Sequence, residues 1–286
     1  MPSRWQRSED GGVWIMGVLN CTPDSFSDGG AFLDNEGTNV EAAVSHGLEM
    51  WKQGAAIIDV GGESTRPGAT AVSLQEELAR VIPVVRELSQ LGCTVSVDTT
   101  KAEVMRQAMH AGATMINDVS ALGHDVESLR VAADTGADVC LMHMQGKPET
   151  MQLKPEYHHV IEEVSNFFEK RIEVCLQAGV HLSSIVLDPG IGFGKRLSDN
   201  VSLIRSIGYF KSKFNMPLLL GVSRKSFLGL LTGCPVEDRE LETAVAGAVG
   251  IAYGADMLRV HDVALQSRAI RVASALTDPA AFSLAS

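Results

Sequence analysis

A regular alternation of short apolar runs with longer amphipathic stretches is the feature that most constrains how this chain can fold. Continuous apolar runs are typical of parallel strands covered on both faces, and we predict eight of them: 13–19, 56–60, 94–97, 115–116, 139–142, 185–187, 218–221 and 257–260. The stretches between them are predicted helices: 40–53, 74–90, 102–111, 126–135, 160–178, 201–213, 240–253 and 263–276. This order predicts βα units that share one parallel sheet.

Four glycines mark a faint internal repeat, each between a predicted helix and the strand that follows it: Gly54, Gly112, Gly136 and Gly254. Glycine just past a helix end can take the left-handed conformation that closes the last turn. No linker rich in Pro, Gly or Ser divides the chain. We therefore predict an α/β fold with a single (β/α)8 TIM barrel over residues 13–276, an extension at 1–12 and a tail at 277–286. A doubly wound open sheet is the alternative.

Polar or charged residues follow every predicted strand. In chain order they are Asn20, Glu63, Thr65, Arg66, Asp98, Asn117, Asp118, His143, Asp188, Ser223, Arg224, Lys225, Arg259 and His261. Barrel active sites lie at the C-terminal ends of the strands, whereas an open sheet concentrates its site at one crevice. The polarity of loops in general explains one or two of these ends but not all eight, so the pattern favours a barrel enzyme.

Two chemical groups can be distinguished among these strand ends. Asp98, Asn117, Asp188 and Lys225 offer the donors and acceptors that read the edge of a planar heterocycle, since a carboxylate can accept two parallel N–H bonds. A structural ion-pair network is the alternative. The second group suits phosphate, because arginine forks match phosphate oxygens: Asn20, Thr65, Arg66, Arg259 and His261. Mg²⁺ would take few protein ligands here, and Asn20 offers one neutral oxygen.

Three loops differ from ordinary βα connections. The glycine-rich run 188–195 fails the Walker A and dinucleotide spacings, and we interpret it as a loop that lets a flat ligand approach the backbone beside Phe193; an ordinary tight turn is the alternative. The connections 21–39 and 61–73 are unusually long. Long loops in compact domains are often functional, so we predict two lids over the site, with variable surface loops as the alternative.

Composition limits the partners and the compartment. The chain has 35 acidic and 24 basic side chains and a formal net charge of −11. Nucleic acid and anionic membranes require clustered surface cations, so we expect neither as a partner. The five cysteines are odd in number and form no C-x-x-C motif, which is typical of reduced thiols in a cytoplasmic protein. Residues 1–12 lack the apolar segment of a signal peptide.

The motifs that carry these residues resemble the dihydropteroate synthase family over residues 13–275. They occur in the family's order: MGVLN at 16–20, TPDSFSDGG at 22–30, DVGGESTRPG at 59–68, SVDT at 96–99, IND at 116–118, LMHM at 141–144, DPG at 188–190, SRKS at 223–226 and RVHD at 259–262. The resemblance implies a transferase of folate biosynthesis. It would condense (7,8-dihydropterin-6-yl)methyl diphosphate with 4-aminobenzoate to give 7,8-dihydropteroate and diphosphate.

The resemblance also implies roles for single residues. Asp98, Lys225, Arg259, Thr65 and Arg66 would be catalytic. The pterin would contact Asp98, Asn117, Asp188 and Lys225, and the diphosphate would contact Asn20, Thr65, Arg66, Arg259 and His261. The 4-aminobenzoate would lie among Phe26, Pro67, Phe193, Lys225 and Ser226. It further implies Mg²⁺ near Asn20, a homodimer in the cytoplasm and competition by sulfonamides.

Two rival functions and two local questions remain. A pterin-binding methyltransferase barrel would share the Asp and Asn face but needs no diphosphate clamp, so Thr65, Arg66 and Arg259 argue against it. A decayed barrel kept as a binding scaffold would have lost part of the charged set.

The small-residue stretch 243–253 predicts either a dimer interface or internal packing under a loop. We interpret Cys21, beside the site, as a packed thiol rather than a nucleophile.

Overall fold

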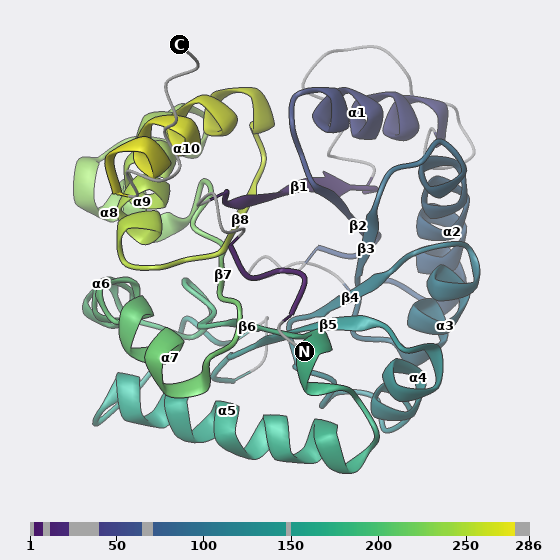
Figure 1. Ribbon diagram of the computed structural model, residues 1–286, viewed down its shortest axis with the longest axis horizontal. Coiled ribbons are helices and arrows are strands. Elements are labelled where there is room, and N and C mark those ends of the chain that lie inside the picture. The colour runs from purple at the N-terminus through teal and green to yellow at the C-terminus, as the bar shows by residue number, and fades with distance from the viewer. Residues whose placement is uncertain (1–2, 8–11, 23–39, 65–70, 147–149, 278–286) are drawn as a thin grey trace.

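The strands form one parallel eight-stranded sheet that curves into a barrel (Figure 1). A computed structural model describes residues 3–7, 12–22, 40–64, 71–146 and 150–277. Neighbouring strands follow the order β6-β5-β4-β3-β2-β1-β8-β7. A bridge between Leu187 and Leu218 joins β6 to the start of β7 and nearly closes the circle. The strands are β1 (Trp14–Asn20), β2 (Ile57–Gly61), β3 (Val95–Asp98), β4 (Met115–Asp118), β5 (Asp138–Met142), β6 (Ile185–Asp188), β7 (Leu219–Leu220) and β8 (Met257–Val260).

Helices surround this barrel on the outside, as Figure 1 shows. They are α1 (Val40–Lys52), α2 (Leu74–Gln90), α3 (Ala102–His110), α4 (Ser128–Thr135), α5 (Val160–Gln177), α6 (Leu197–Arg205), α7 (Ile207–Phe214), α8 (Ser226–Thr232), α9 (Glu240–Ala252) and α10 (Val263–Thr277). The predicted (β/α)8 TIM barrel is confirmed. The open-sheet alternative is wrong, because β1 pairs with β8 and the Leu187–Leu218 bridge joins the two ends of the strand order, β6 and β7.

Three details differ from the sequence prediction. Several strands extend one or two residues further than their apolar runs, since the ladder includes the polar residues Asn20, Asp98 and Asp188. The predicted helix 201–213 is two helices, α6 and α7, which meet at Ser206. A short helix, α8, follows β7 where none was predicted. Boundaries therefore moved, but the order of elements did not.

The four glycine junctions adopt the predicted backbone. Gly54, Gly112, Gly136 and Gly254 all have positive φ, from 63° to 110°. At Gly112 a second constraint applies, because a side chain there would overlap the Ser89 hydroxyl on α2. These positions end their helices and turn the chain into the next strand, as the repeat indicated.

The first described residues close the lower end of the barrel, which the sequence analysis did not anticipate. Trp5 is 4% exposed and packs inside the barrel with one apolar side chain from each of seven strands: Met16, Ile57, Met115, Cys140, Val186, Leu219 and Met257. Its indole nitrogen donates to Asp138 at 2.7 Å, and Arg7 donates to the Ala255 carbonyl. The segment at 3–7 is therefore part of the core rather than an appendage.

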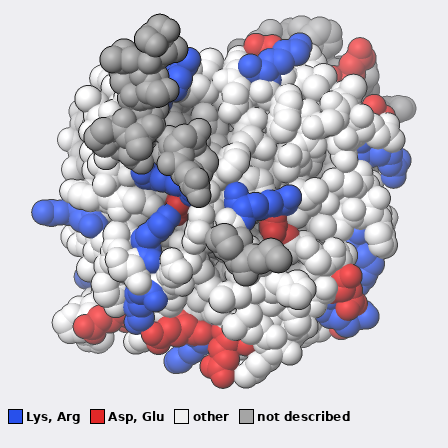
Figure 2. All heavy atoms as spheres, viewed as in Figure 1, with Lys and Arg blue, Asp and Glu red and all other residues white. Residues whose placement is uncertain are grey.

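Acidic and basic side chains are interspersed on the face shown in Figure 2. Among the described residues on that face, no broad basic surface is visible. None of the described helices is long and apolar enough to cross a membrane. A hollow lies at the end of the barrel where the strands begin, beside Arg4, His110, Asp134 and Asp138. It holds none of the predicted site residues.

Candidate active site at the barrel mouth

A cavity lies at the C-terminal end of the strands and gathers residues from six of them or from the loops that follow. Its lining is Asp98, Asn117, Val119, Met142, Asp188, Phe193, Gly221, Ser223, Lys225, Arg259 and His261. All four residues of the predicted heterocycle-reading group are in this list, together with Arg259 and His261 of the phosphate group. Residues far apart in the chain are thus brought to one site, as the strand-end pattern predicted.

A buried network organises one side of the cavity. The Arg259 guanidinium donates through Nε to Asp59 and through Nη2 to Asp98, both at 2.7 Å. Asn117 Nδ2 donates to the same Asp59 oxygen at 2.8 Å. With its amide nitrogen held in this way, Asn117 turns its carbonyl oxygen away from Asp59, where it can accept from a ligand N–H. Asp59 therefore orients two cavity residues without lining the cavity itself.

The charges of this network are set by burial and by one another. Burial raises the pKa of Asp98 to about 7, although Arg259 opposes the shift. Burial alone would lower the pKa of Arg259, but Asp59 and Asp98 outweigh it and raise the pKa, so the guanidinium stays charged. A carboxyl group that titrates near neutral pH beside a fixed cation is typical of functional sites.

Asp188 and Lys225 form a second group in the same lining. Asp188 Oδ1 accepts the backbone N–H of Gly190 at 2.7 Å, and Lys225 Nζ donates to the Ile191 carbonyl. Lys225 Nζ also lies 4.6 Å from the centre of the Phe193 ring, a cation–π distance. Burial lowers the pKa of Lys225 to about 8, with Asp188 opposing, and burial raises the pKa of Asp188.

The predicted phosphate group is only partly described. His261 lies at the mouth, with its Nδ1 2.8 Å from the Ser223 hydroxyl. Asn20 ends β1 and pairs in register with Gly61, which pairs with Asp98 on β3, so Asn20 lies on the same rim. Thr65 and Arg66, and Phe26 and Pro67 of the aminobenzoate set, lie outside the described residues. Ser226 is exposed at the start of α8 and does not line the cavity.

Four of the described strand-end residues serve the scaffold instead. Glu63 pairs with Lys101 at 2.5 Å and accepts the backbone N–H of Val72. Asp118 accepts the backbone N–H groups of Ser120 and Leu122 at 2.7 and 2.9 Å and so builds a turn. His143 Nδ1 lies 3.0 Å from Lys195 Nζ beneath the glycine-rich loop. Arg224, which we expected at the mouth, pairs with Glu240 on α9. A polar residue at a strand end therefore does not always face the ligand, because tight turns need polar partners too.

Comparison with known proteins identifies the family. Residues 16–261 match the family described as pterin binding enzyme. The dihydropteroate synthase of Escherichia coli strain K12 is 47% identical over 262 residues, which cover 91% of this chain and 90% of that protein. The chain belongs to the dihydropteroate synthase family. The resemblance seen in the motifs is thereby confirmed.

Solved structures of dihydropteroate synthases have the same architecture. The Yersinia pestis enzyme, solved in a sulfonamide drug complex, superposes with a TM-score of 0.88 at 42% identity and covers 96% of this chain and 98% of its own. The Xanthomonas albilineans enzyme, solved with 4-aminobenzoic acid, has a TM-score of 0.85 at 45% identity, with 93% of each chain covered. Both ligands belong to those proteins, and both structures share the barrel described above.

Asp59 was not among the predicted site residues, although the sequence carries a signal for it. Asp59 is fully buried and lies in the middle of the apolar run of β2. A charge inside a strand that is covered on both faces requires partners. In this chain those partners are Arg259 and Asn117, which both line the cavity, so the buried charge was the signal for a residue that organises the site. The expected packed thiol is confirmed at Cys21, which is fully buried, and burial raises its pKa to about 12.

Proposed function

We propose that this chain condenses (7,8-dihydropterin-6-yl)methyl diphosphate with 4-aminobenzoate to form 7,8-dihydropteroate and diphosphate in folate biosynthesis. The observation that carries the proposal is the composition of the barrel-mouth cavity. Asp98, Asn117, Asp188 and Lys225 line it together with Arg259 and His261. One cavity thus offers a heterocycle-reading edge and cations for a leaving anion, which is what this reaction requires of its site.

The pterin is held by complementary hydrogen bonding. Asp188 accepts from the amidine-like N–H groups of the pterin ring, and Lys225 donates to a ring carbonyl or nitrogen. Asn117 offers its carbonyl oxygen to a ring N–H, because its amide nitrogen donates to Asp59. Asp98 lies across the cavity and stabilises positive charge on the pterin. These residues are mostly buried, so their hydrogen bonds are stronger than they would be in water.

Departure of the diphosphate supplies the driving step. The C–O bond breaks, its electron pair goes to the diphosphate oxygen, and a cation remains on the pterin methylene. Arg259 and His261, with Thr65 and Arg66, stabilise the departing anion, and such electrostatic stabilisation is usually the largest contribution to catalysis. The arylamine nitrogen then attacks the methylene to form the C–N bond, and its proton passes to water or to the departed diphosphate. Measurement of the secondary isotope effect at the methylene tests this SN1-like order: a large effect would support it, and a value near unity would contradict it.

Magnesium fits the donors at this rim. Among the described residues, no cluster of three His, Cys, Asp or Glu side chains can hold a metal. The half-buried Asn20 side chain makes no hydrogen bond with the described residues, and its amide oxygen is a suitable hard ligand. Mg²⁺ commonly takes one or two protein ligands and completes its shell with substrate phosphates and water. When bound, it would neutralise charge on the diphosphate beside Arg259 and His261.

The amine substrate lies on the side of the cavity formed by Phe193 and Lys225. The family resemblance also assigns it Phe26 and Pro67, which lie outside the described residues, and Ser226, which is exposed beside the cavity lining at the start of α8. Phe193 gives the aryl ring an apolar wall, and Lys225 lies over the face of that wall. Sulfonamides have the shape and charge of 4-aminobenzoate and compete for the same place. Added 4-aminobenzoate should therefore relieve sulfonamide inhibition, and inhibition that it leaves unchanged contradicts this assignment.

The direct test is incubation of the purified protein with both substrates, followed by measurement of dihydropteroate. Product in the complete reaction and none without 4-aminobenzoate supports the proposal. A methyltransferase barrel would form no dihydropteroate but would transfer a methyl group to a corrinoid. Tight pterin binding without any product would indicate a scaffold. The variant Asp98→Asn should lose activity. The matched control is Asp134→Asn, on the exposed surface of α4, which should keep it.

We also propose a cytoplasmic homodimer that meets at α9. Gly247 and Gly250 face inward against Leu258 and Leu220, so internal packing explains these small residues. The outer face repeats apolar side chains every four residues, all at least 41% exposed: Leu241, Val245, Val249 and Tyr253. A second copy would cover this face. Sedimentation should give a dimer for the wild type and a monomer for Val245→Glu, whereas a monomeric wild type contradicts the proposal.

A further inference from the structure

The loop of residues 190–194, which carries Phe193, is rich in glycine and yet fixed in place. Gly190, Gly192 and Gly194 all have positive φ, from 62° to 84°. Glycine allows these conformations but does not select them, because it has the greatest backbone freedom of any residue. Something other than the loop's own sequence must therefore hold it. Hydrogen bonds from side chains to four peptide carbonyls hold this loop in place.

Each of the four successive carbonyls accepts a hydrogen bond from a different side chain. Lys225 donates to Ile191 and Gln152 to Gly192. Lys195 donates to Phe193 at 3.0 Å, and Tyr157 donates to Gly194 at 2.8 Å. Peptide groups outside helices and strands normally find water or other backbone. A run in which every carbonyl has a side-chain donor is a clamp, and we call Gln152, Tyr157 and Lys195 the loop clamp.

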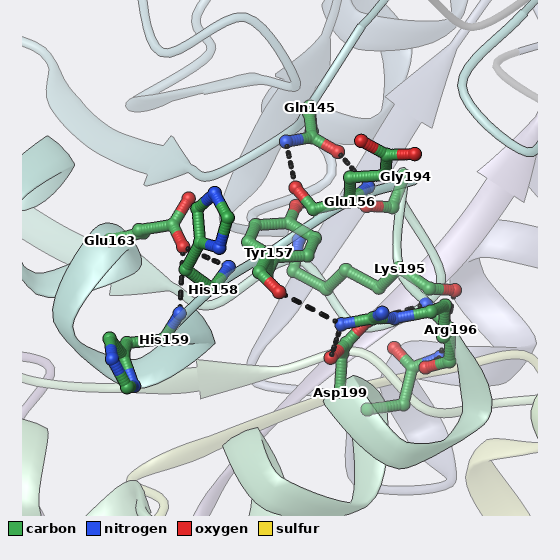
Figure 3. A network of polar contacts seen from close by, with 11 residues as sticks. Gln145, Glu156, Tyr157, His158, His159, Glu163, Gly194, Lys195, Arg196 and Asp199 are labelled. Carbon is green, nitrogen blue, oxygen red and sulfur yellow. Dashed lines mark hydrogen bonds and ion pairs between the residues drawn. The ribbon is translucent and has the colours of Figure 1, made fainter. Parts of the chain in front are cut away.

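Two clamp residues, Gln152 and Tyr157, lie on the loop between β5 and α5, which is itself braced (Figure 3), and Lys195 directly follows the glycine-rich loop. Gln145 donates to the Glu156 carbonyl and accepts from the Glu156 N–H, at 2.8 and 3.0 Å. Arg196 reaches back from the glycine-rich loop and donates to the Tyr157 carbonyl at 3.2 Å. The two loops approach so closely that a side chain at Gly194 would overlap the Gln145 carbonyl. They therefore form one connected unit.

Lys195 is the most deeply buried member of the clamp. It is 3% exposed, and its Nζ lies 3.0 Å from each of three acceptors: the Phe193 carbonyl, the His143 carbonyl and His143 Nδ1. Burial lowers the pKa of Lys195 to about 7, while Asp188 and Asp199 oppose the shift. Even a neutral amine keeps two donors. The side chain therefore ties Phe193 to the end of β5 at the level of the cavity.

We propose that Gln152, Tyr157 and Lys195 are positioning residues that fix the Phe193 wall and thereby set the affinity for the amine substrate. The inference rests on the proposed function, since it assigns 4-aminobenzoate to the Phe193 side. None of the three lines the cavity, so they act through the loop rather than by touching the ligand. Asn117 and Arg259 are held separately, by Asp59. The pterin residues Asp188 and Lys225 bond to the start of the loop, at Gly190 and Ile191, whereas Tyr157 bonds to its far end, at Gly194.

The test removes one clamp hydroxyl without changing the shape of the ring. In Tyr157→Phe, the buried Gly194 carbonyl loses its donor, and the KM for 4-aminobenzoate should rise about 5- to 10-fold, the effect of one unsatisfied buried group. The KM for the pterin diphosphate should change by less than about twofold. Tyr209→Phe is the matched control, because this half-exposed tyrosine on α7 makes none of the clamp's hydrogen bonds. It should match the wild type in both constants.

A double-mutant cycle shows whether Tyr157 acts through Phe193. In a Phe193→Ala background, Tyr157→Phe should add less than about twofold to the KM for 4-aminobenzoate, because the wall it positions is gone. Fully additive effects overturn the inference. Lys195→Met provides a second route to the same KM change, and Lys195→Arg should recover part of the loss.

Two failures can be told apart. If the wild type forms no dihydropteroate, the proposed function and the inference both fall. If the wild type is active and Tyr157→Phe keeps both KM values, the inference alone falls. A parallel rise in both KM values, or a loss of kcat alone, also overturns it, because a purely structural defect would produce that result.

Discussion

Asp98 and Lys225 carry the two titrations expected to govern activity near neutral pH. Asp98, with its pKa raised to about 7 chiefly by burial, loses its negative charge as pH falls below that value. Lys225, with its pKa lowered to about 8 chiefly by burial, loses its positive charge as pH rises above it. We predict that kcat/KM for the pterin diphosphate rises through about pH 7 and falls through about pH 8, with its maximum between them.

The pH profile has an internal control. In Lys225→Arg the side chain cannot lose its proton in this range, so the alkaline limb should disappear while the acid limb stays. Circular dichroism at each pH separates titration of the site from unfolding. A wild-type profile that is flat from about pH 6 to about pH 9 would contradict the roles given to these residues.

Asp59 is expected to matter although it does not line the cavity. Asp59→Asn keeps the volume of the side chain but removes the buried charge that pairs with Arg259 and accepts from Asn117. Breaking a buried charge pair costs at least about 2 kcal/mol, so kcat/KM for the pterin diphosphate should fall about 30-fold or more. Steady-state kinetics checks this, and a folded variant with wild-type kcat/KM would refute it.

The pterin-reading residues could be predicted because the barrel converts sequence order into geometry. A polar residue at a strand's C-terminal end reaches the mouth, and the pterin-reading residues Asp98, Asn117 and Asp188 follow that rule. The rule fails at Asp118, which accepts a backbone N–H in a turn, and at Arg224, which pairs with Glu240 on a neighbouring helix. Which partner a polar group finds depends on loop conformation. Sequence periodicity holds no information about that.

At the scale of elements, the clearest prediction concerns the contribution of the N-terminal segment 3–7 to stability. Trp5 fills the lower end of the barrel interior and donates to the Asp138 carboxylate. Trp5→Ala should lower the free energy of unfolding by about 3–5 kcal/mol, the usual effect of deleting a large buried side chain. Denaturant titration measures this change. Leu153→Ala, at a side chain that is 77% exposed, should change the free energy by less than about 0.5 kcal/mol.

The same variant separates stability from catalysis. The barrel bottom lies at the opposite end of the strands from the cavity, so folded Trp5→Ala should keep the wild-type KM for both substrates. A loss of less than about 1 kcal/mol would mean that the segment rests on the barrel without belonging to its core.

The elements themselves were predictable to within a few residues, and the exceptions have physical causes. Continuous apolar runs located β2 and β5, which are buried along their whole length, and amphipathic periodicity located α2, which buries one face. The break between α6 and α7 at Ser206 occurs within a continuous helical pattern. Residues 3–7 carry no periodicity at all, since a single tryptophan does the packing there. Tertiary contacts, not local preference, decide such segments.

At the scale of the whole molecule, the local charge of the cavity differs from the net charge of the chain. The chain has a formal net charge of −11, yet the cavity brings Lys225, Arg259 and His261 together with Asp98 and Asp188. The global excess of acid says little about the ligand, because the fold gathers cations locally. A small anion that leaves from a neutral heterocycle suits such a site.

The most direct test of the central claim is to measure diphosphate and dihydropteroate together in one reaction, with and without Mg²⁺. We predict equal amounts of the two products, faster formation with Mg²⁺, and at least about a 30-fold loss in Arg259→Gln, which removes a cation from the leaving anion. Diphosphate without dihydropteroate, or dihydropteroate formed at the wild-type rate by Arg259→Gln, would contradict the account.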